Sequence, residues 1–481
     1  MRPTTVLIAR WALIAACTLL AFGPAIVRTL DDIDANGLLG YLLVKPLLAL
    51  TAAIGIARRR KDKVTVYDRE VDAIVGGIAL ALAASFVAFL VPRYAENFLL
   101  LRVDLVGFWI FVFGACCLLF GLRAAGAYWP VWLMVMVLAP APYRVFVTAF
   151  GGTWAASSTV LVVDAAIAVG IAVGRSWRRG VAGFAATVIL GLVILGVLLL
   201  VDAPGGVVQL LPPIAAGAVV SLSFITLTHF TFPSTPLLAQ RPSVVVQPRA
   251  AIIALVLVSV AFALFPQPHV DTTPDAAPGP ASAPANTGQR IPVGWAEDSI
   301  THYPWATRYF GRLATLTRQQ LTTDDVVPAW DDKGRKRTVV IDTLRTHEPA
   351  TLIVNPLQTM YDVVTDRRSP VLSVNIGHGV TGSLGTVVDD DLLLTWTELS
   401  FDWYRDGAYE RVTIISVDNH DPGAQFPQLE LSLTGRLAMS LTILLRGSEA
   451  ATDLRSQYKD RDMLTTLGTA LVDAQQEVVI G

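Results

Sequence analysis

The chain has 481 residues, of which 53% are hydrophobic and 16% are charged, and its formal net charge is −2. This near-neutral net charge lacks the excess of basic residues that is typical of nucleic-acid-binding proteins, so we expect no nucleic-acid partner. The long apolar runs all lie in the first 265 residues, and the rest of the chain is polar. The composition therefore predicts a membrane protein, with the lipid bilayer as its first partner.

Nine apolar stretches fill the first part of the chain, and seven of them reach the length of about 20 residues that a membrane-spanning helix needs. They run over residues 6–27, 38–57, 72–91, 98–122, 127–140, 145–173, 181–201, 213–233 and 250–265. We expect Pro140–Ala141–Pro142–Tyr143 to form a sharp turn between the short stretch 127–140 and the long stretch 145–173. The predicted fold is a polytopic α-helical membrane protein with about nine transmembrane helices and a C-terminal extracytoplasmic α+β domain.

The orientation follows from the loops, because cytoplasmic loops carry an excess of Lys and Arg. With the N-terminus inside, the predicted inner loops hold Arg2, Arg58, Arg59, Arg60, Lys61, Lys63, Arg69, Arg123, Arg175, Arg178, Arg179, Arg241 and Arg249, whereas the outer loops hold Arg28, Arg93 and Arg144. We expect the first stretch to be a retained helix and not a cleaved signal peptide. These features predict a bacterial inner-membrane protein whose C-terminal domain lies outside the cytoplasm.

The chain divides into a multi-spanning domain (1–265), a Pro- and Ala-rich linker (266–289) and one compact domain (290–481). In the compact domain, apolar spacing predicts a helix over Ala306–Leu321, and β-prone runs predict strands over Thr338–Leu344, Thr351–Val354, Val371–Ile376 and Leu392–Thr397. Asp406–Gly407 between two β-prone runs predicts a tight hairpin. Leu429–Leu445 fits either helix or strand, and Glu449–Val478 contains the apolar spacing of a closing helix.

Two motifs in the membrane half resemble the exosortase/archaeosortase family, over roughly residues 65–235. Residues 120–142 read FGLRAAGAYWPVWLMVMVLAPAP, with an FG-x-R-A helix end and a terminal P-x-P, and residues 174–179 read GRSWRR. Exosortases are multi-spanning bacterial transpeptidases that cut a C-terminal sorting tag from exported proteins, using a Cys, an Arg and a His near the outer face. The resemblance implies the same membrane architecture and an exported protein as partner.

The residues that carry the family's chemistry do not carry over to this chain. The family's Cys would fall near Trp154–Ser158, where residues 153–158 read TWAASS, and its Arg would fall near residue 197, within ILGVLLLV. His229 is the lone His of the membrane half, and the three cysteines, Cys17, Cys116 and Cys117, lie in predicted helices. We therefore assign no catalytic residue. Ser157 and Ser158 are outer-face candidates, but a serine nucleophile needs an adjacent general base, and small polar residues in spans usually serve packing.

Ionisable residues inside the spans are the other candidates, because such groups are costly in a bilayer and mark functional positions. Lys45 lies in the second stretch and Asp164 in the sixth, and their opposite signs predict a buried pair. That pair either locks two helices together or forms an ion, proton or headgroup site. Arg102 and Asp104 lie near the outer end of the fourth stretch, where a side chain can extend its charged group to the membrane surface and so avoid most of the free-energy cost of burying the charge.

The polar domain contains two acidic clusters, Asp389–Asp390–Asp391 and Asp418–Asn419–His420–Asp421. Neither has the spacing of a known cation-binding loop, so we interpret both as solvated turns and expect no metal and no cofactor. Asn375–Ile376–Gly377–His378–Gly379 predicts a special backbone turn with a structural histidine.

Three functions remain open from the sequence. The favoured one is an exosortase-like membrane protein without the family's Cys, Arg and His, which acts as a non-catalytic partner or scaffold in envelope assembly or protein sorting. Its outer domain would contact exported proteins or envelope glycans. The alternatives are a membrane transpeptidase or hydrolase that uses other residues, and a transporter component that uses Lys45 and Asp164.

Overall fold

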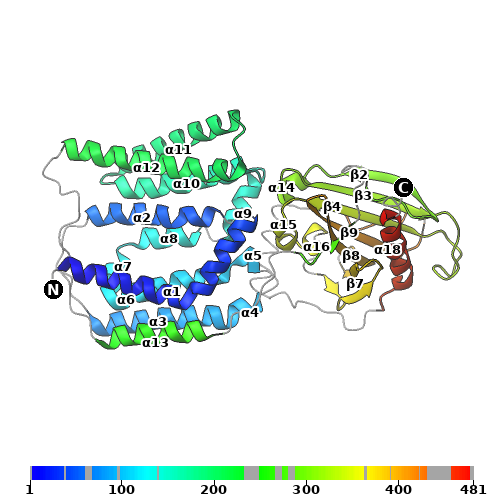
Figure 1. Cartoon of the computed structure of the whole chain (residues 1–481), viewed down its shortest axis with the longest axis horizontal. Helices are drawn as coiled ribbons and strands as arrows, with labels where there is room; N and C mark the ends of the chain where they lie inside the picture. Colours follow the sequence, from blue (N-terminus) through cyan, green and yellow to red (C-terminus); the bar gives the residue numbers. More distant parts are fainter. Residues whose placement is uncertain are drawn as a thin grey trace. The chain divides into compact units, whose positions relative to one another are not determined.

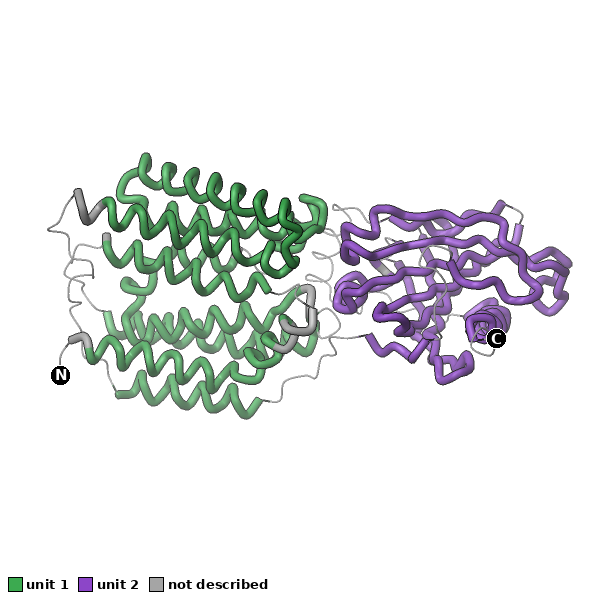
Figure 2. Tube along the Cα trace, turned by 45° about the horizontal axis from the view of Figure 1, so that its top comes forward, with its two compact units in different colours: residues 1–270 green, residues 271–481 purple. Residues whose placement is uncertain are grey.

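The computed structural model forms two compact units, Met1–Val270 and Asp271–Gly481 (Figure 2). It describes residues 3–36, 40–59, 68–94, 98–137, 140–231, 249–265, 274–279, 288–361, 366–390, 392–421, 423–430 and 457–476. The first unit is helical and the second is built on a β-sheet (Figure 1). The division falls inside the predicted linker.

The helices of the first unit are α1 (Pro3–Asn36), α2 (Tyr41–Arg59), α3 (Arg69–Ser85), the π-helical turn η1 (Phe86–Leu90), α4 (Val91–Arg93), α5 (Phe98–Leu101), α6 (Val103–Phe120), α7 (Leu122–Gly126), α8 (Trp129–Val137), α9 (Pro140–Ala149), α10 (Trp154–Val173), α11 (Trp177–Leu200), α12 (Gly205–Thr231) and α13 (Arg249–Leu264). Among the described residues, seven helices are long and apolar enough to cross a membrane. They coincide with the seven long apolar stretches, so this part of the prediction is confirmed. The two shorter stretches form α8, with 9 residues, and α13, with 16.

The predicted turn at Pro140–Tyr143 is wrong, because Pro140 begins the helix α9. Proline is tolerated in the first turn of a helix, where its missing N–H has no intrahelical acceptor. The chain turns later, at Gly151 and Gly152, whose φ angles of +103° and +71° suit glycine. The apolar stretch 145–173 is therefore two helices, α9 and α10.

Small residues let the helices of the first unit approach closely. A Cβ at Gly55 of α2 would overlap the backbone of Ala172 of α10, and a Cβ at Gly191 of α11 would lie 2.6 Å from a Val162 methyl group of α10. Such contacts are typical of membrane bundles, where packing replaces the hydrophobic effect as the driving force. They place α10 against both α2 and α11, and most of its side chains are buried.

The second unit contains a sheet with short helices and one longer helix. Its strands are β1 (Ala277–Pro278), β2 (Trp295–His302), β3 (Thr315–Thr323), β4 (Thr338–Thr346), β5 (Arg367–Arg368), β6 (Leu372–Asn375), β7 (Thr381–Asp389), β8 (Leu394–Arg405) and β9 (Ala408–Val417), and its helices are α14 (Ala306–Phe310), α15 (Ala350–Val354), α16 (Leu357–Met360) and α18 (Arg461–Gln476). The strand order is β2-β3-β4-β9-β8-β7-β5, with β6 on β7 and β1 on β8. All pairs are antiparallel except β1 with β8.

Alternating side chains of the central strands feed two hydrophobic cores. Leu399, Val412 and Ile414 pack with Leu464 and Leu467 of α18 in one core. Trp396, Ile415 and Val417 of the same strands belong to a second core, which includes residues of α14, α15 and α16. Because side chains of a strand point alternately to opposite faces, the two cores cover the two faces of the sheet.

The sheet unit contains several of the elements that the sequence predicts. The Asp406–Gly407 hairpin between β8 and β9 is confirmed, with φ angles of +50° and +73° at the two residues. The closing helix is confirmed as α18, and two of the predicted strands as β4 and β6. The strand predicted at 392–397 forms the start of β8. Residues 431–445 of the ambiguous segment lie outside the described residues.

Two element predictions are wrong. The helix predicted over Ala306–Leu321 ends at Phe310, because Gly311 with φ +104° stops it, and the chain then forms β3. The strand predicted over Thr351–Val354 is the helical turn α15. In addition, the predicted linker 266–289 contains β1, so part of it belongs to the sheet.

Candidate functional site in the membrane unit

Ser157 lies at the centre of a buried hydrogen-bonded group in the membrane unit. Its Oγ contacts the Tyr143 hydroxyl and accepts a hydrogen bond of 2.7 Å from Gln209 Nε2, which also lies 3.3 Å from the Tyr143 hydroxyl. All three side chains are buried. Because the amide nitrogen only donates, the two hydroxyls share the remaining hydrogen bond between them.

Three different helices bring these residues together. Thr153 caps α10 by accepting a hydrogen bond of 3.1 Å from the Ala156 N–H, which places Ser157 in the first turn. Tyr143 comes from α9 and Gln209 from the start of α12. The described partners of Ser157 Oγ are a phenol and an amide, so neither an imidazole nor a carboxylate is in place to remove its proton.

Tyr41, near the start of α2, extends this group. Its ring stacks on the Tyr143 ring with centroids 3.7 Å apart and planes inclined by 18°. The Tyr41 hydroxyl is buried, and the described part of the chain offers it no hydrogen-bond partner. Arg102 and Arg144 lie near enough for their charges to act on this phenol. The cluster therefore continues from Ser157 toward the cations at the start of α6 and in α9.

Arg102 and Asp104 form an ion pair inside the unit. Arg102 Nε lies 3.1 Å from Asp104 Oδ1 and Nη2 lies 3.0 Å from Oδ2, while Nη2 also contacts the Thr29 hydroxyl. The guanidinium lies 4.9 Å from the centre of the Phe98 ring. Arg102 is fully buried, so it does not snorkel to the surface as the sequence suggested.

The backbone of Arg102 is unusual, with φ +42° and ψ +54°. A non-glycine residue in this left-handed region is strained and is kept only where its surroundings hold it. Arg102 lies at the boundary between α5 and α6. The turn at this boundary lets its guanidinium reach both carboxylate oxygens of Asp104, two residues later. The structure thus brings together the two predicted residues of this pair.

Lys45 and Asp164 lie on the packed helices α2 and α10, and both are buried. Their charges act on each other, but no ion pair within 4.0 Å joins them among the described residues. Lys45 Nζ instead lies 3.5 Å from the Val135 carbonyl and 5.6 Å from the Tyr41 ring centre. Direct pairing of Lys45 with Asp164 stays a prediction.

The contact to Val135 gives the Lys45 ammonium a backbone carbonyl as an acceptor inside the packed helices. A buried cation needs such partners, because a charge inside a span is costly.

Other predicted positions do not join the cluster. Ser158 is buried, and no described residue forms a hydrogen bond with its Oγ, which agrees with a packing role. Val197 lies in α11 and is 54% exposed, as an apolar side chain facing lipid would be. His229 is in the last turn of α12, and its side chain lies outside the described residues.

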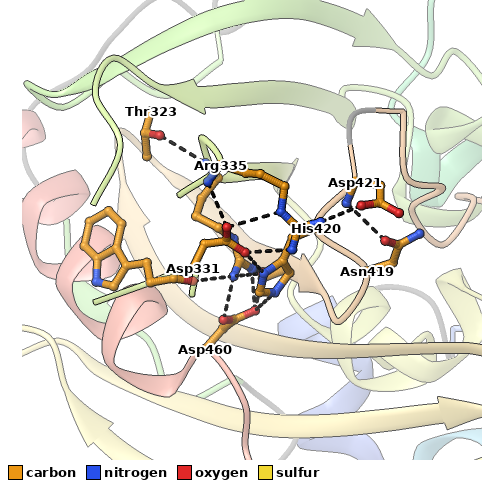
Figure 3. Close-up of polar contacts among 10 residues, drawn as sticks. Thr323, Asp331, Arg335, Asn419, His420, Asp421 and Asp460 are labelled. Carbon is orange, nitrogen blue, oxygen red and sulfur yellow. Dashed lines mark hydrogen bonds and ion pairs between the residues drawn. The ribbon is translucent and has the colours of Figure 1, made fainter. Parts of the chain in front are cut away.

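The second unit contains a separate polar cluster, shown in Figure 3. Arg335 donates to both carboxylate oxygens of Asp331, at 3.2 and 2.8 Å, and Arg337 donates to both oxygens of Asp460, at 3.0 and 2.5 Å. His420 Nδ1 lies 2.9 Å from Arg337 Nη1 and 2.8 Å from Asp331 Oδ1. The cluster ties the β3–β4 loop to the segment after β9 and to the start of α18.

Charge complementarity explains this cluster as a structural one. The Arg335 guanidinium and backbone N–H, together with His420, hold the pKa of Asp331 well below its usual range. The predicted solvated turn at Asp418–Asp421 is thus only partly exposed, since His420 points into this network.

The remaining acidic and histidine motifs have local partners. Asp390 pairs with Arg367 at 2.7 Å, and Asp389 accepts a hydrogen bond from the Leu392 N–H at 2.8 Å. His378 lies 2.9 Å from Asp473, and the positive φ angles at 377–379 confirm the special turn. Among the described residues, no group of three or more His, Cys, Asp or Glu side chains is placed to hold a metal ion.

Sequence reasoning found Ser157, Arg102 and Asp104 but missed their partners Tyr41, Tyr143, Gln209 and Thr29. Gln209 lies between the apolar stretches 181–201 and 213–233, so the pattern of polar residues inside stretches did not indicate it. Comparison with known proteins adds nothing to these assignments: no family model, curated protein or solved structure matches the chain.

Proposed function

We propose that the chain is an exosortase-like integral membrane protein that lacks the family's Cys, Arg and His. It acts as a non-catalytic partner or scaffold in cell-envelope assembly or protein sorting, and its C-terminal unit contacts exported proteins or envelope glycans. Catalysis by the family's route requires a thiolate with a cation and an acid–base group beside it. Ser157 lies within Trp154–Ser158, the range in which the resemblance places the thiol.

The environment of Ser157 is the observation that carries the proposal. A serine hydroxyl attacks a carbonyl only when a neighbouring base takes its proton. Ser157 Oγ contacts the Tyr143 phenol and the Gln209 amide, and the amide cannot accept a proton at neutral pH. This arrangement supports a structural hydroxyl that links α9, α10 and α12.

The positions of the other reactive groups support the same conclusion. His229 follows Gln209 by 20 positions on α12, which corresponds to about 30 Å along the helix axis. Cys116 and Cys117 lie in the last turns of α6, roughly 21 Å along that helix from Arg102, and both are buried. A Cys–His site beside Ser157 therefore cannot be assembled from these residues.

The proposed topology has nine crossings, with α8 and α13 added to the seven long helices. The helices α3 and α13 begin with Arg69 and Arg249, and α11 begins beside Arg175 and Arg178. Figure 1 draws the starts of α1, α3 and α13 at one end of the helical unit. Excess basic residues at that end favour a cytoplasmic N-terminus. An odd number of crossings then puts the C-terminal unit outside the cytoplasm of a bacterial cell.

The test is to compare Ser157→Ala and Ser157→Cys with the matched variant Ser158→Ala in cells that carry the chain. Each tagged protein is cross-linked in cells, extracted in mild detergent, and its bound proteins are identified. We expect Ser157→Ala to keep the same bound exported proteins and the same cellular phenotype. Loss of the phenotype in Ser157→Ala, at an unchanged protein level, would favour the transpeptidase or hydrolase alternative.

One observation favours the transporter alternative as a second candidate. The Lys45 ammonium is buried 3.5 Å from the Val135 carbonyl, and Asp164 is buried on the packed helix α10. Buried ionisable residues inside spans mark ion and proton pathways in many transporters. Uptake of a solute that depends on both Lys45 and Asp164, measured in reconstituted vesicles, would support this candidate.

A further inference from the structure

One edge of β8 is only partly covered. The strand pairs with β9 from Trp396 to Arg405, but β7 covers it only from Leu394 to Ser400. Beyond Ser400 the edge is occupied by β1, whose residues Ala277 and Pro278 lie opposite Trp403 and Tyr404 in a parallel pairing. We call this edge, Phe401–Arg405, the β8 slot.

The β1 segment fits the slot with small residues. Ala277 is half-buried and packs against the core that contains Trp403. The Gly279 N–H donates to the Tyr404 carbonyl at 2.9 Å, and a Cβ at Gly279 would lie 3.2 Å from Arg405 Cβ and 3.3 Å from Trp403 Cγ. The slot therefore selects an extended segment with a small residue at each of these two positions.

The fit of β1 is incomplete. It forms two residue pairs with β8, and Pro278 has no N–H to donate. Arg405 is 5% exposed; it pairs with Glu410 at 2.5 Å and lies 4.9 Å from the Trp403 ring centre, but its Nε has no hydrogen-bond partner among the described residues. A buried donor without an acceptor destabilises the site, so a segment that supplies a carbonyl oxygen to Nε would bind better.

We infer that the β8 slot is a peptide-binding site for an extended Ala-, Pro- and Gly-rich segment of an exported protein, and that residues 274–279 are its resident, exchangeable occupant. Addition of a strand to a sheet edge is a common mode of peptide recognition, in which backbone hydrogen bonds give affinity and side-chain pockets give specificity. The identity of the partner rests on the proposed function. The slot itself rests on the Ala277, Gly279 and Arg405 contacts.

The test uses the purified full chain in detergent and a fluorescent peptide that copies residues 272–281, TTPDAAPGPA. The resident segment competes at high effective concentration, so the native chain should bind the peptide weakly. Ala277→Asp puts a charge against the core and should free the slot, which raises peptide affinity at least tenfold as measured by fluorescence anisotropy. The matched variant Pro278→Asp puts the same charge at an exposed neighbouring position and should bind as the native chain does.

Two peptide controls define the site. A peptide with Asp at the position of Ala277, or with Val at the position of Gly279, should not bind the Ala277→Asp chain. If the Ala277→Asp chain keeps its native tryptophan spectrum and binds no peptide, the slot is not a peptide site. Equal binding of all three peptides would also overturn it.

A measurement on the native chain covers the case in which Ala277→Asp does not fold. An exchangeable segment opens without global unfolding, so the Gly279 amide should exchange with deuterium at least a hundredfold faster than the Ile414 amide in β9. Equal exchange rates would show that β1 is a permanent strand and would end the inference. Because neither measurement uses a cell, a negative result here is separate from failure of the sorting role.

Discussion

Arg318 and Asp342 face each other across β3 and β4 and form a bidentate ion pair. Arg318 Nε lies 2.7 Å from Asp342 Oδ1, and Nη2 lies 2.7 Å from Oδ2. The Tyr361 hydroxyl donates to the same Oδ2 at 2.7 Å. Burial, followed by the charge of Asp342, raises the pKa of Tyr361 well above its ordinary value, so the phenol stays a donor.

Removal of one partner of this pair should destabilise the second unit strongly. Arg318→Ala leaves the Asp342 carboxylate, which is 2% exposed, without its cation. Breaking a buried pair of this kind typically costs about 3–5 kcal/mol. Thermal unfolding of the full chain, followed through the tryptophan spectrum, should show the loss.

An exposed pair in the same unit provides the control. Arg367 and Asp390 have the same bidentate geometry but are 49% and 66% exposed. Exposed pairs contribute about 0–1 kcal/mol, so Arg367→Ala should change the unfolding temperature little. Equal losses in Arg318→Ala and Arg367→Ala would contradict the role given to burial.

Asp331 should make the second unit sensitive to acid. Its hydrogen bonds with Arg335 and His420 lower its pKa in the folded state, so the carboxylate stabilises the fold above the unfolded pKa of about 4. This stabilisation is lost as the pH falls through the lower folded pKa. Asp331→Asn should therefore be less stable than the native chain near neutral pH, and the difference should shrink below about pH 4.

The exposed neighbour Asp332 is the matched control for this pH series. Asp332→Asn should follow the native unfolding temperature at every pH. A constant gap between Asp331→Asn and the native chain from neutral to strongly acid pH would contradict the linkage.

Asp104→Asn should weaken the membrane unit, because it removes the anion that neutralises the fully buried Arg102. The expected loss is about 3–5 kcal/mol, as for other buried pairs. A lower unfolding temperature in detergent and a lower protein level in the membrane would both follow. Arg69→Ala, at an exposed position at the start of α3, should leave both unchanged.

Lys45 and Asp164 should be coupled in a double-mutant cycle. Lys45→Met and Asp164→Asn each leave one buried charge with less compensation, and the double variant removes both charges. We expect the double variant to be at least 1 kcal/mol more stable than the sum of the two single losses predicts. Additive losses would mean that the two residues act separately.

The three cysteines should be inaccessible from outside the cell. All are buried, and Cys17 lies on α1 roughly 18 Å along the helix from Thr29, which contacts Arg102. An impermeant maleimide should label Asp202→Cys, between α11 and α12, in intact cells, but not the native chain. Labelling of Cys116 or Cys117 from outside would contradict the proposed orientation.

The long spans were predictable because 20 apolar residues in a row have few structural alternatives. The positions at which one helix ends and the next begins were harder to predict. Pro140 was read as a turn, yet proline fits the first turn of α9, and the Gly151–Gly152 pair ends that helix. In the second unit, Leu313 and Leu316 fit helical spacing, but the threonines of β3 favour a strand and pairing with β4 decides it.

Only some of the residues of the candidate site in the membrane unit could be predicted from the sequence. Ser157, Arg102 and Asp104 stood out as polar residues in apolar stretches, and Asp104 is close to Arg102 in sequence. Tyr143 and Gln209 reach Ser157 across sequence separations of 14 and 52 residues. Such contacts depend on how α9, α10 and α12 pack, which periodicity does not report.

The close approach of Gly55 to Ala172 restricts how the membrane unit can move. With two backbones in direct contact there, α2 and α10 cannot slide past each other at that level. Lys45 and Asp164 lie 10 and 8 positions earlier on the same two helices. A larger residue at position 55 would therefore force the two helices apart and change the height of Lys45 relative to Asp164.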